Sequence, residues 1–386
     1  MSKQTETGKL ALWGVGDQGI RVISSLPDGV RRLIMPVAVD SDLQALICGP
    51  TVQKIRIGLK KDLAGGRSDD PGTPPKASRE NEEKIREKLA SVRTLLVVGG
   101  LGGQVASAQI PLICRLARRM KIFTLVFATR PFSFEGKKRD RLFREAREAI
   151  EKTGVGLACF SLDRLVGKIE DDTPHQEVFH RCDRILTEAV ECAIAYLSAP
   201  PERGGDCSSL GDVFAGAGEA VMGIGEAAGP EDLVKSAKAA ISTLALTPAE
   251  MAGTRGVVVQ IDGGDPIPFR QIKEAVGSVS RLLGEETELF YTVTRREKPG
   301  GKINFRILAG GIPLRPPGGE GSAIPVTLNH DGRPPRQQKI DFGKFTRGFF
   351  AESEPTSRDG EDLDIPTFIR QGVQLDEEKE SGREVR

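Results

Sequence analysis

The sequence is poor in the residues that build metal centres and disulfide frameworks. Its 386 residues include three histidines and six cysteines, with no C-x-x-C pair and no pair of histidines at ligand spacing. Neither a metal site nor a disulfide scaffold is therefore predicted. An excess of charge of one sign is also lacking, because 55 basic and 54 acidic residues leave a net charge of +1. This balance provides no field that would favour binding to nucleic acid or to an anionic membrane.

Long hydrophobic runs are missing as well. The first ten residues are mainly polar, and the longest mainly apolar run, 122–128, is far too short to cross a bilayer. We therefore expect a cytoplasmic protein with no direct membrane span. The length is sufficient for two domains followed by a tail.

Glycine, in contrast, is abundant, with 45 residues, and two glycine clusters each separate a strand-like run from a helix-like one. In the more prominent cluster, the apolar run 95–98 leads through Gly102 and Gly103 into a helical apolar pattern that ends near residue 120. A strand, a glycine loop and a helix in this order direct unpaired N–H groups and the positive end of a helix dipole at one point, which suits a phosphate. The loop fits neither G-x-x-x-x-G-K-[ST] nor an intact G-x-G-x-x-G.

The other cluster follows the apolar run 10–13, and its glycines Gly14, Gly16 and Gly19 do match G-x-G-x-x-G. In a dinucleotide-binding fold, Asp40 would be placed to hold a ribose hydroxyl. A simple dinucleotide domain needs only one such loop, however. A dinucleotide-dependent oxidoreductase is therefore the weakest of the functional alternatives.

Strand-like and helix-like segments alternate over the first 160 residues, which predicts an α/β fold with a mainly parallel sheet. A broad apolar stripe along 176–197 then predicts a long, buried helix. Beyond it we expect a second part of the chain, in which an Ala/Gly-rich helical segment to about residue 246 precedes the remaining elements. These are a strand at 256–261, a helix at 269–283, strands at 288–294 and 302–308, and a linker from Gly310 to Gly360 that has no core pattern.

Several motifs in this order resemble those of FtsZ, the bacterial tubulin relative. The most specific match is PFSFEGKKR at 131–139, and the others lie at 40–46, 222–225, 254–257 and 361–370. The resemblance implies a tubulin-like fold with a parallel-sheet GTP-binding domain, a central helix and a smaller α+β domain. It predicts these limits: a GTP-binding domain at 1–203 with its central helix at about 176–198, an α+β domain at 204–310, a disordered linker at 311–360, a partner-binding peptide at 361–370 and a charged tail at 371–386.

The resemblance also implies roles for two pairs of residues. Phe179 and Asp183 are four residues apart on the long helix and face the same way, so that the ring can stack on guanine and the carboxylate can accept from its N1–H and N2–H groups. Glu135 and Arg139 match positions that contact the ribose and nearby nucleotide atoms. Asp42 is expected to be only a turn residue.

The phosphate loops depart from the family pattern. Asp17 and Gln18 replace glycines, and Val105 stands where the family loop GGGTGTG has a hydroxyl donor. A carboxylate at Asp17 repels a triphosphate unless it points away or helps to hold a cation. The residues predicted to surround the phosphates and base from these two loops are Gly14, Gly16, Asp17, Gln18, Gly19 and Arg21, with Gly102, Gly103, Gln104, Val105, Ala106 and Ser107.

The catalytic loop that the family contributes to the neighbouring subunit is also altered. One alignment makes Asp212 the surviving catalytic carboxylate and another makes it Asp206. The resemblance implies GTP or GDP as ligand, with Mg²⁺ as a candidate companion, and head-to-tail filaments in which one subunit completes the GTPase site of the next. Two functions stay open: a division-septum GTPase, or a non-hydrolysing paralogue that assists another FtsZ. In both, peptide 361–370 would bind membrane tethers.

Overall fold

The structure is a computed structural model that describes residues 9–48, 53–57, 76–167, 172–199, 207–216, 218–295 and 302–312, together with the backbone of 357–358 and 361–362. One compact unit extends to Pro316, and residues 317–386 form a second unit. In the second unit, β11 (Ser357–Arg358) pairs antiparallel with β12 (Glu361–Asp362). Most of the linker, the peptide and the charged tail predicted from the sequence lie outside the described residues.

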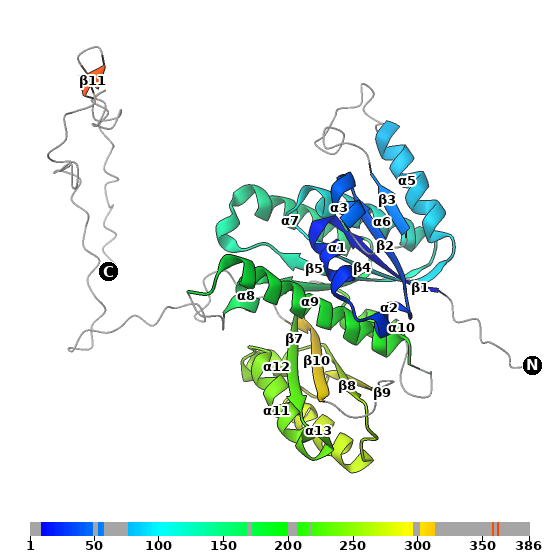
Figure 1. Ribbon diagram of the computed structural model, residues 1–386, viewed down its shortest axis with the longest axis vertical. Coiled ribbons are helices and arrows are strands. Elements are labelled where there is room, and N and C mark those ends of the chain that lie inside the picture. Colours follow the sequence, from blue (N-terminus) through cyan, green and yellow to red (C-terminus); the bar gives the residue numbers. More distant parts are fainter. Residues whose placement is uncertain are drawn as a thin grey trace, which may run out of the picture. The chain divides into compact units, whose positions relative to one another are not determined.

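A six-stranded, all-parallel sheet forms the first half of the large unit (Figure 1). Its strand order is β3-β2-β1-β4-β5-β6. The chain runs from β1 to one neighbour, β2, and later returns to the other side of β1 as β4. The connections that follow β1 and β4 therefore leave in opposite directions, and a crevice opens beyond the carboxyl ends of these two strands. The strands are β1 (Lys9–Val15), β2 (Met35–Asp40), β3 (Gln53–Arg56), β4 (Val92–Gly100), β5 (Phe123–Arg130) and β6 (Gly156–Ser161).

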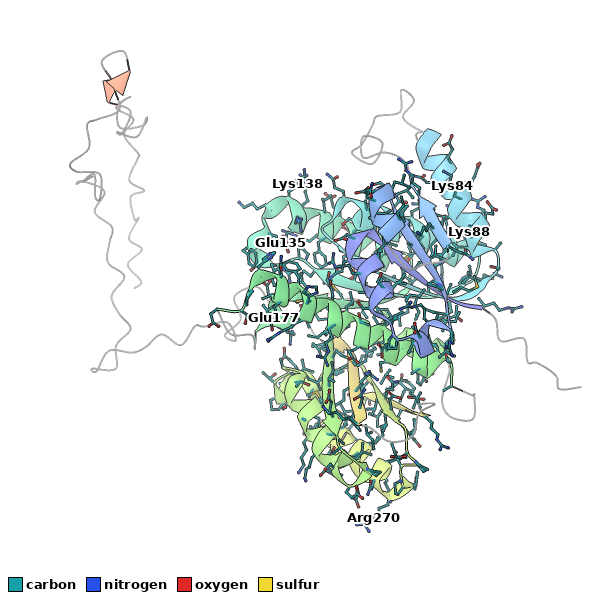
Figure 2. The ribbon with its side chains drawn as sticks, viewed as in Figure 1. Lys84, Lys88, Glu135, Lys138, Glu177 and Arg270 are labelled. Atoms are coloured by element: carbon teal, nitrogen blue, oxygen red, sulfur yellow. The ribbon has the colours of Figure 1, made fainter. Side chains whose placement is uncertain are left out.

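Helices cover both faces of this sheet, because its central strands are apolar on both sides. Trp13 of β1 and Val97 of β4 belong to one buried cluster, whereas their chain neighbours Leu12 and Val98 belong to another on the opposite face. Charged side chains such as Lys84 and Lys138 project from the helices into solvent (Figure 2). The helices and 3₁₀ turn are α1 (Gly16–Ser25), α2 (Asp28–Arg31), α3 (Leu43–Cys48), α5 (Lys76–Leu89), α6 (Gln104–Arg119), η1 (Ser133–Glu135), α7 (Lys137–Glu151) and α8 (Leu162–Val166).

The long helix α9 (His175–Leu197) packs against α1 on one side and against all four strands of a second sheet on the other. Its buried residues Leu186 and Val190 share a core cluster with Leu12 of β1 and with Leu308 of the later strand β10 (Ile303–Ile312). This central helix therefore connects the two sheets through one continuous apolar core. The short helix α10 (Cys207–Val213) follows it.

The second sheet is mixed, with the order β7-β10-β8-β9, and only the pair β8–β9 is parallel. Its strands are β7 (Glu219–Ala227), β8 (Gly256–Gly263), β9 (Glu288–Arg295) and β10 (Ile303–Ile312). The accompanying helices and 3₁₀ turn are η3 (Pro230–Asp232), α11 (Leu233–Thr243), α12 (Pro248–Ala252) and α13 (Phe269–Ser280). Among the helices in the described ranges, none is long and apolar enough to cross a membrane.

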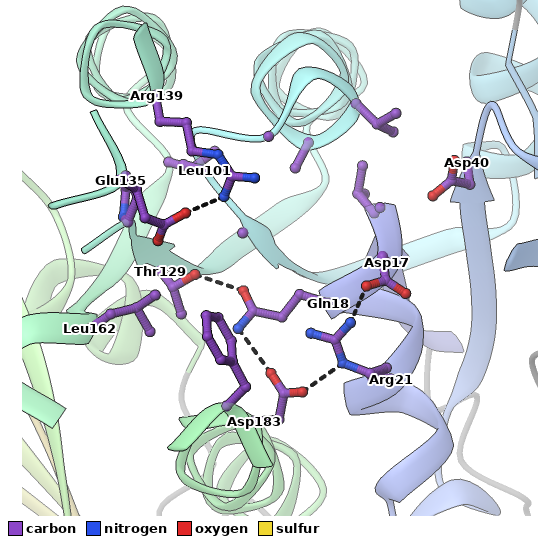
Figure 3. Close-up of a pocket in the computed structure, with 18 of the residues that line it drawn as sticks. Asp17, Gln18, Arg21, Asp40, Leu101, Thr129, Glu135, Arg139, Leu162 and Asp183 are labelled. Atoms are coloured by element: carbon purple, nitrogen blue, oxygen red, sulfur yellow. Dashed lines mark hydrogen bonds and ion pairs between the residues drawn. The ribbon is translucent and has the colours of Figure 1, made fainter. Parts of the chain in front are cut away.

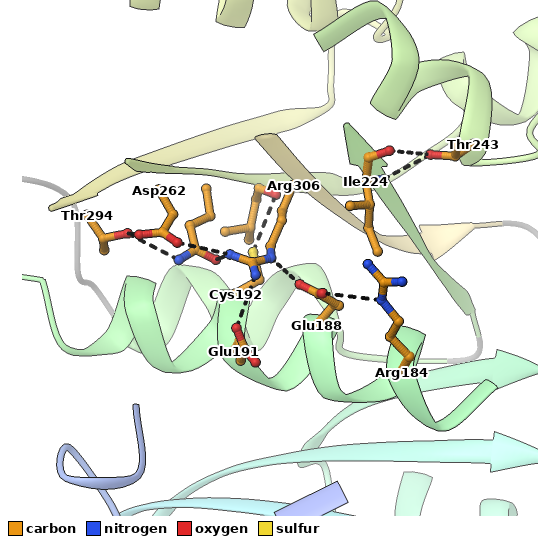
Figure 4. A network of polar contacts seen from close by, with 11 residues as sticks. Arg184, Glu188, Glu191, Cys192, Ile224, Thr243, Asp262, Thr294 and Arg306 are labelled. Atoms are coloured by element: carbon orange, nitrogen blue, oxygen red, sulfur yellow. Dashed lines mark hydrogen bonds and ion pairs between the residues drawn. The ribbon is translucent and has the colours of Figure 1, made fainter. Parts of the chain in front are cut away.

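A buried ion network also joins α9 to this sheet (Figure 4). The guanidinium of Arg306 on β10 bonds Glu188, lies 3.1 Å from Glu191 and lies 3.8 Å from Asp262 on β8. Burial lowers the pKa of Arg306, but the charges of Glu188 and Glu191 outweigh burial and raise it above its usual value. Arg306 is therefore a fixed cation that balances part of a three-carboxylate cluster.

The predicted alternation of strands and helices, the long helix and the late strands are confirmed, whereas the helical prediction for the segment up to residue 246 is wrong in part. Residues 219–227 instead form strand β7, and α11 packs directly on the backbone of this strand. A Cβ at Gly223 would lie 2.3 Å from the carbonyl oxygen of Ala240, and one at Gly225 would lie 2.0 Å from that of Ser236. Glycine here permits close helix–strand packing, so composition was misleading. The domain limits at 203 and 310 stay predictions.

Candidate functional site

A cavity of about 680 Å³ opens at the carboxyl ends of β1, β4 and β5 (Figure 3). Its walls come from the starts of α1 and α6, from η1 and α7, from α8, and from the first three turns of α9. This is the crevice at the topological switch point of the parallel sheet, where such folds bind ligands. Its volume lies within the usual range for small-molecule sites.

Two helix N-termini meet at one side of the cavity. A Cβ at Gly16, the first residue of α1, would lie 3.8 Å from the backbone nitrogen of Ala106 in the first turn of α6. The N-caps Val15 and Gly103 supply no side-chain hydrogen bond to either helix. The N–H groups and positive dipole ends of a ten-residue and a sixteen-residue helix therefore converge, which favours an anion such as phosphate.

The glycines that match G-x-G-x-x-G divide into two groups. Gly16 lines the cavity and has a positive φ of 75°. Gly14 and Gly19 lie outside its lining. Their missing side chains instead allow α1 to pack closely against the sheet. A Cβ at Gly14 would lie 2.4 Å from the carbonyl oxygen of Gly19, and a Cβ at Gly19 would lie 2.3 Å from that of Val98. These two positions thus have a packing role.

The N-cap Gly103 and the first-turn residues Val105 and Ala106 of α6 contribute to the cavity lining. Gly102, with φ of 95°, donates its N–H to the hydroxyl of Ser107 over 2.9 Å. Ser107 therefore braces the loop and does not line the cavity. Gln104 is exposed and also lies outside the lining.

Asp17 is neutralised by a neighbour on its own helix. It forms an i,i+4 ion pair with Arg21, and its side chain is 79% exposed. The pair reduces the repulsion that the carboxylate would otherwise exert on a bound phosphate. Asp40 also lines the cavity, and its carboxylate accepts a hydrogen bond from the backbone N–H of Asp42. The carboxylate of Asp42 accepts one from the backbone N–H of Gln44. These bonds agree with the expectation that Asp42 is a turn residue.

Asp183 is buried, with 7% of its surface exposed, and both carboxylate oxygens have partners. One oxygen accepts from the Nε2 of Gln18 over 3.0 Å, and the other accepts from the Nε of Arg21 over 2.7 Å. Burial lowers the pKa of Arg21, but the hydrogen bond and charge of Asp183 outweigh burial and raise that pKa. The Oε1 of Gln18 accepts from the hydroxyl of Thr129 over 2.6 Å.

Phe179 lies one turn before Asp183 and forms part of an aromatic wall. Its ring is 5.6 Å from that of Phe132 and 4.7 Å from that of His175. His175, His180, Thr129 and Leu162 line the cavity although the sequence prediction did not include them. Helical spacing could have revealed His175, four residues before Phe179.

Glu135 and Arg139 line the cavity and form an ion pair across one turn at the start of α7. Glu135 also accepts a hydrogen bond from the backbone N–H of Phe132 over 3.0 Å. The carboxylate is therefore fixed, whereas the Arg139 side chain is 57% exposed and can adjust to a ligand. The ribose pair, the base pair and part of each predicted phosphate loop thus line one cavity, whereas Gly14, Gly19, Gly102, Gln104 and Ser107 lie outside its lining.

Asp212 stands apart from this cavity. It is exposed on α10, and its carbonyl oxygen lies 3.4 Å from a guanidinium nitrogen of Arg255, which also bonds the carbonyl of Ala215. Arg255 therefore holds the end of α10 against the second sheet. Asp206, the alternative catalytic candidate, lies outside the described residues.

The comparisons with known proteins agree with this architecture. Residues 218–313 match the family model described as "FtsZ family, C-terminal domain". An FtsZ from M. jannaschii, solved as a mutant form, superposes with a TM-score of 0.65 at 22% identity, over 79% of this chain and 91% of that one. CetZ2 from Haloferax volcanii, solved as a GTPgS-bound protofilament, gives a TM-score of 0.60 at 18% identity, over 79% and 93% of the two chains.

A parallel six-stranded sheet, a central helix and a small mixed sheet, with a cavity at the switch point, define a protein with the tubulin and FtsZ fold. At such identities the solved structures support the fold alone. The family-model match covers residues 218–313, the segment that forms the second sheet, and it agrees with this fold.

Proposed function

We propose that this chain is an FtsZ-like filament protein that binds GTP and GDP in the cavity between α1, α6 and α9. The observation that carries the proposal is the meeting of two uncapped helix N-termini with the aromatic residue and buried carboxylate of α9 in one cavity. The helix starts suit the phosphates, Glu135 and Arg139 suit the ribose, and Phe179 provides an aromatic face for the base.

Magnesium fits this site only together with the nucleotide. Among the described residues, no group of three or more His, Cys, Asp or Glu side chains is placed to hold a metal ion. Mg²⁺ commonly uses one or two carboxylates together with phosphate oxygens and water. Asp17 and Asp40 are the lining carboxylates that would hold it beside the phosphates.

The proposed filament is head-to-tail. Leu43 and Ile47 on α3 and Phe134 in η1 are 48%, 58% and 76% exposed, next to cavity residues Asp40 and Glu135. Exposed apolar side chains beside a site favour contact with another protein, here a second copy of this chain. Related solved structures are titled as an FtsZ dimer and as a protofilament. In such a filament, Asp212 of one subunit is proposed to reach the nucleotide of the next.

The test measures phosphate release from GTP at rising protein concentration. If a neighbour completes the site, turnover per molecule rises with concentration, because assembly creates active sites. Asp212→Ala should abolish release and leave GTP binding by the monomer unchanged. Asp232→Ala, at a half-buried aspartate outside the cavity lining that pairs with Lys235, should change neither. Sensitivity at Asp206 in place of Asp212 would show that the other alignment is correct.

A second candidate is a non-hydrolysing paralogue that joins filaments of another FtsZ. Val105 and Ala106 favour it, because they line the cavity without any hydroxyl donor. Nucleotide binding without phosphate release at any concentration, together with co-sedimentation with an FtsZ, would support this function over the first.

A role at the bacterial division septum, with recruitment by membrane tethers, is proposed from the sequence of 361–370. Leu363, Ile365, Phe368 and Ile369 provide an apolar group there, which suits a docking peptide. Deleting 361–370 should abolish septal localisation and leave nucleotide binding unchanged. Septal localisation of the truncated protein would refute this part of the proposal.

A further inference from the structure

Asp183 is the residue through which this site would recognise guanine, and its surroundings are unusual for a recognition group. A carboxylate that reads a base should offer its oxygens to the ligand. Here Gln18 and Arg21 of α1 already donate to the two oxygens, over 3.0 and 2.7 Å, and Figure 3 shows Asp183 facing both side chains.

The two donors reproduce the pattern of a guanine edge. Guanine presents two neighbouring N–H groups, N1–H and N2–H, one for each oxygen of a carboxylate. Gln18 presents an amide N–H to one oxygen of Asp183, and Arg21 presents a guanidinium N–H to the other. We propose that Gln18 and Arg21 are specificity-determining residues that replace the guanine edge at Asp183, so that the site binds nucleotides with little discrimination between bases. This inference rests on the proposed nucleotide-binding function.

Neighbouring residues fix the Gln18 amide in this position. A carboxylate can only accept hydrogen bonds, so the nitrogen of the amide must face Asp183, and its oxygen then accepts from the buried hydroxyl of Thr129. Gly100 provides the space, because a Cβ there would lie 2.7 Å from the Oε1 of Gln18. A glycine at this position and the long amide at Gln18 are therefore complementary.

Arg21 is held from two sides. It bonds Asp183 through Nε and Asp17 through a terminal nitrogen. Charge-assisted hydrogen bonds of this kind are stronger than neutral ones. Guanine would have to displace these donors or share the remaining lone pairs with them, so Asp183 gives it little advantage over adenine. The phosphates and ribose, which every nucleotide shares, keep their partners.

The experiment compares GDP, inosine diphosphate and ADP by calorimetric titration against the full chain and its variants. In the unaltered protein we expect dissociation constants for GDP and ADP within about fivefold of each other. In Gln18→Ala/Arg21→Ala, Asp183 is released, so the ratio of GDP affinity to ADP affinity should rise at least tenfold. The loss of Arg21 beside Asp17 affects the phosphates of both nucleotides alike and leaves this ratio unchanged. Inosine diphosphate, which lacks the 2-amino group, should gain less than GDP.

Two controls accompany the double variant. Adding Asp183→Ala to it should remove the gain for GDP. Arg181→Ala, which deletes an exposed arginine paired with Glu177 two residues from Asp183, should leave all three affinities unchanged. Melting temperatures with and without nucleotide check folding. If the double variant does not fold, the single change Gln18→Ala frees one oxygen of Asp183 and should still favour GDP over ADP.

The possible outcomes distinguish a failure of this inference from a failure of the proposed nucleotide-binding function. A preference of the unaltered protein for GDP over ADP of more than tenfold would overturn the inference and leave the nucleotide site intact. A folded Gln18→Ala/Arg21→Ala variant whose ratio of GDP to ADP affinity is unchanged would also overturn the inference and leave the nucleotide site intact. Absence of binding of every nucleotide to the unaltered protein and to the variants would overturn the proposed function, and the inference with it.

Discussion

Replacing Arg306 by methionine should destabilise the protein far more than removing an exposed ion pair from the same sheet. The Arg306 side chain is 6% exposed, and its partners Glu188, Glu191 and Asp262 are 14%, 10% and 16% exposed. Without the guanidinium, three nearly buried carboxylates lose their common cation. Removing one partner of a buried ion pair costs about 3–5 kcal/mol, which is a large part of a typical folding free energy of about 5–15 kcal/mol.

The matched control is Lys302→Met. Lys302 precedes β10 and pairs with Glu226, but these side chains are 71% and 43% exposed. Solvent screens such a pair, so its loss should cost no more than about 1 kcal/mol. Urea unfolding followed by the fluorescence of Trp13 gives both values, since the chain has one tryptophan and it is fully buried in the large sheet.

A rescue variant tests the cause of the loss. If the loss of this cation beside buried carboxylates destabilises Arg306→Met, then adding Glu188→Gln and Glu191→Gln should recover about half of the loss or more, because neutral amides are less costly to bury than carboxylates. The slope of unfolding free energy against urea should stay constant. A loss for Arg306→Met as small as that for Lys302→Met, or no recovery in the rescue variant, would refute this reasoning.

Three further predictions follow from packing, charge and burial. Gly14→Ala should destabilise the fold by about 1–3 kcal/mol because its Cβ would lie 2.4 Å from a carbonyl oxygen, whereas Gly29→Ala, with no atom within 4 Å of the new Cβ, should be neutral or stabilising in thermal melts. Asp17→Asn should tighten nucleoside triphosphate binding about threefold at low salt and less at high salt, since its exposed charge lies near the phosphates in a water-like dielectric; an unchanged affinity would contradict this. Burial raises the pKa of four thiols to about 12, so they should resist iodoacetamide at pH 8 until urea unfolds the chain, while half-buried Cys207 reacts before these four. The free energy of unfolding should also fall above pH 9, where the unfolded thiols ionise. The four are Cys114, Cys159, Cys182 and Cys192.

The elements and the one-turn pairs were predictable because their information is local. Period and glycine spacing indicated the parallel strands and the long helix, and an interval of four residues placed Phe179 with Asp183 and Glu135 with Arg139. Strand β7 was missed because Gly223 and Gly225 allow α11 to pack closely on the strand, and composition does not reveal such a contact.

The partners of Asp183 were beyond prediction for a related reason. Gln18 and Arg21 are 165 and 162 residues away from it in the chain, and they meet it only because α1 and α9 pack side by side. The sequence indicated that both phosphate loops were altered. It did not indicate that two residues of α1 would satisfy the carboxylate expected to read the base, because that follows from tertiary packing alone.

The charges around the cavity determine what can hold a nucleotide there. Its described lining contains four carboxylates, Asp17, Asp40, Glu135 and Asp183, and two arginines, each of which already pairs with at least one of them. A triphosphate therefore meets little free positive charge on side chains. Attraction must come from the backbone N–H groups of α1 and α6 and from a cation that arrives with the phosphates. In the proposed site, phosphate binding would therefore depend on the backbone, so the Val105 and Ala106 side chains could depart from the family pattern while the two helix starts stay together.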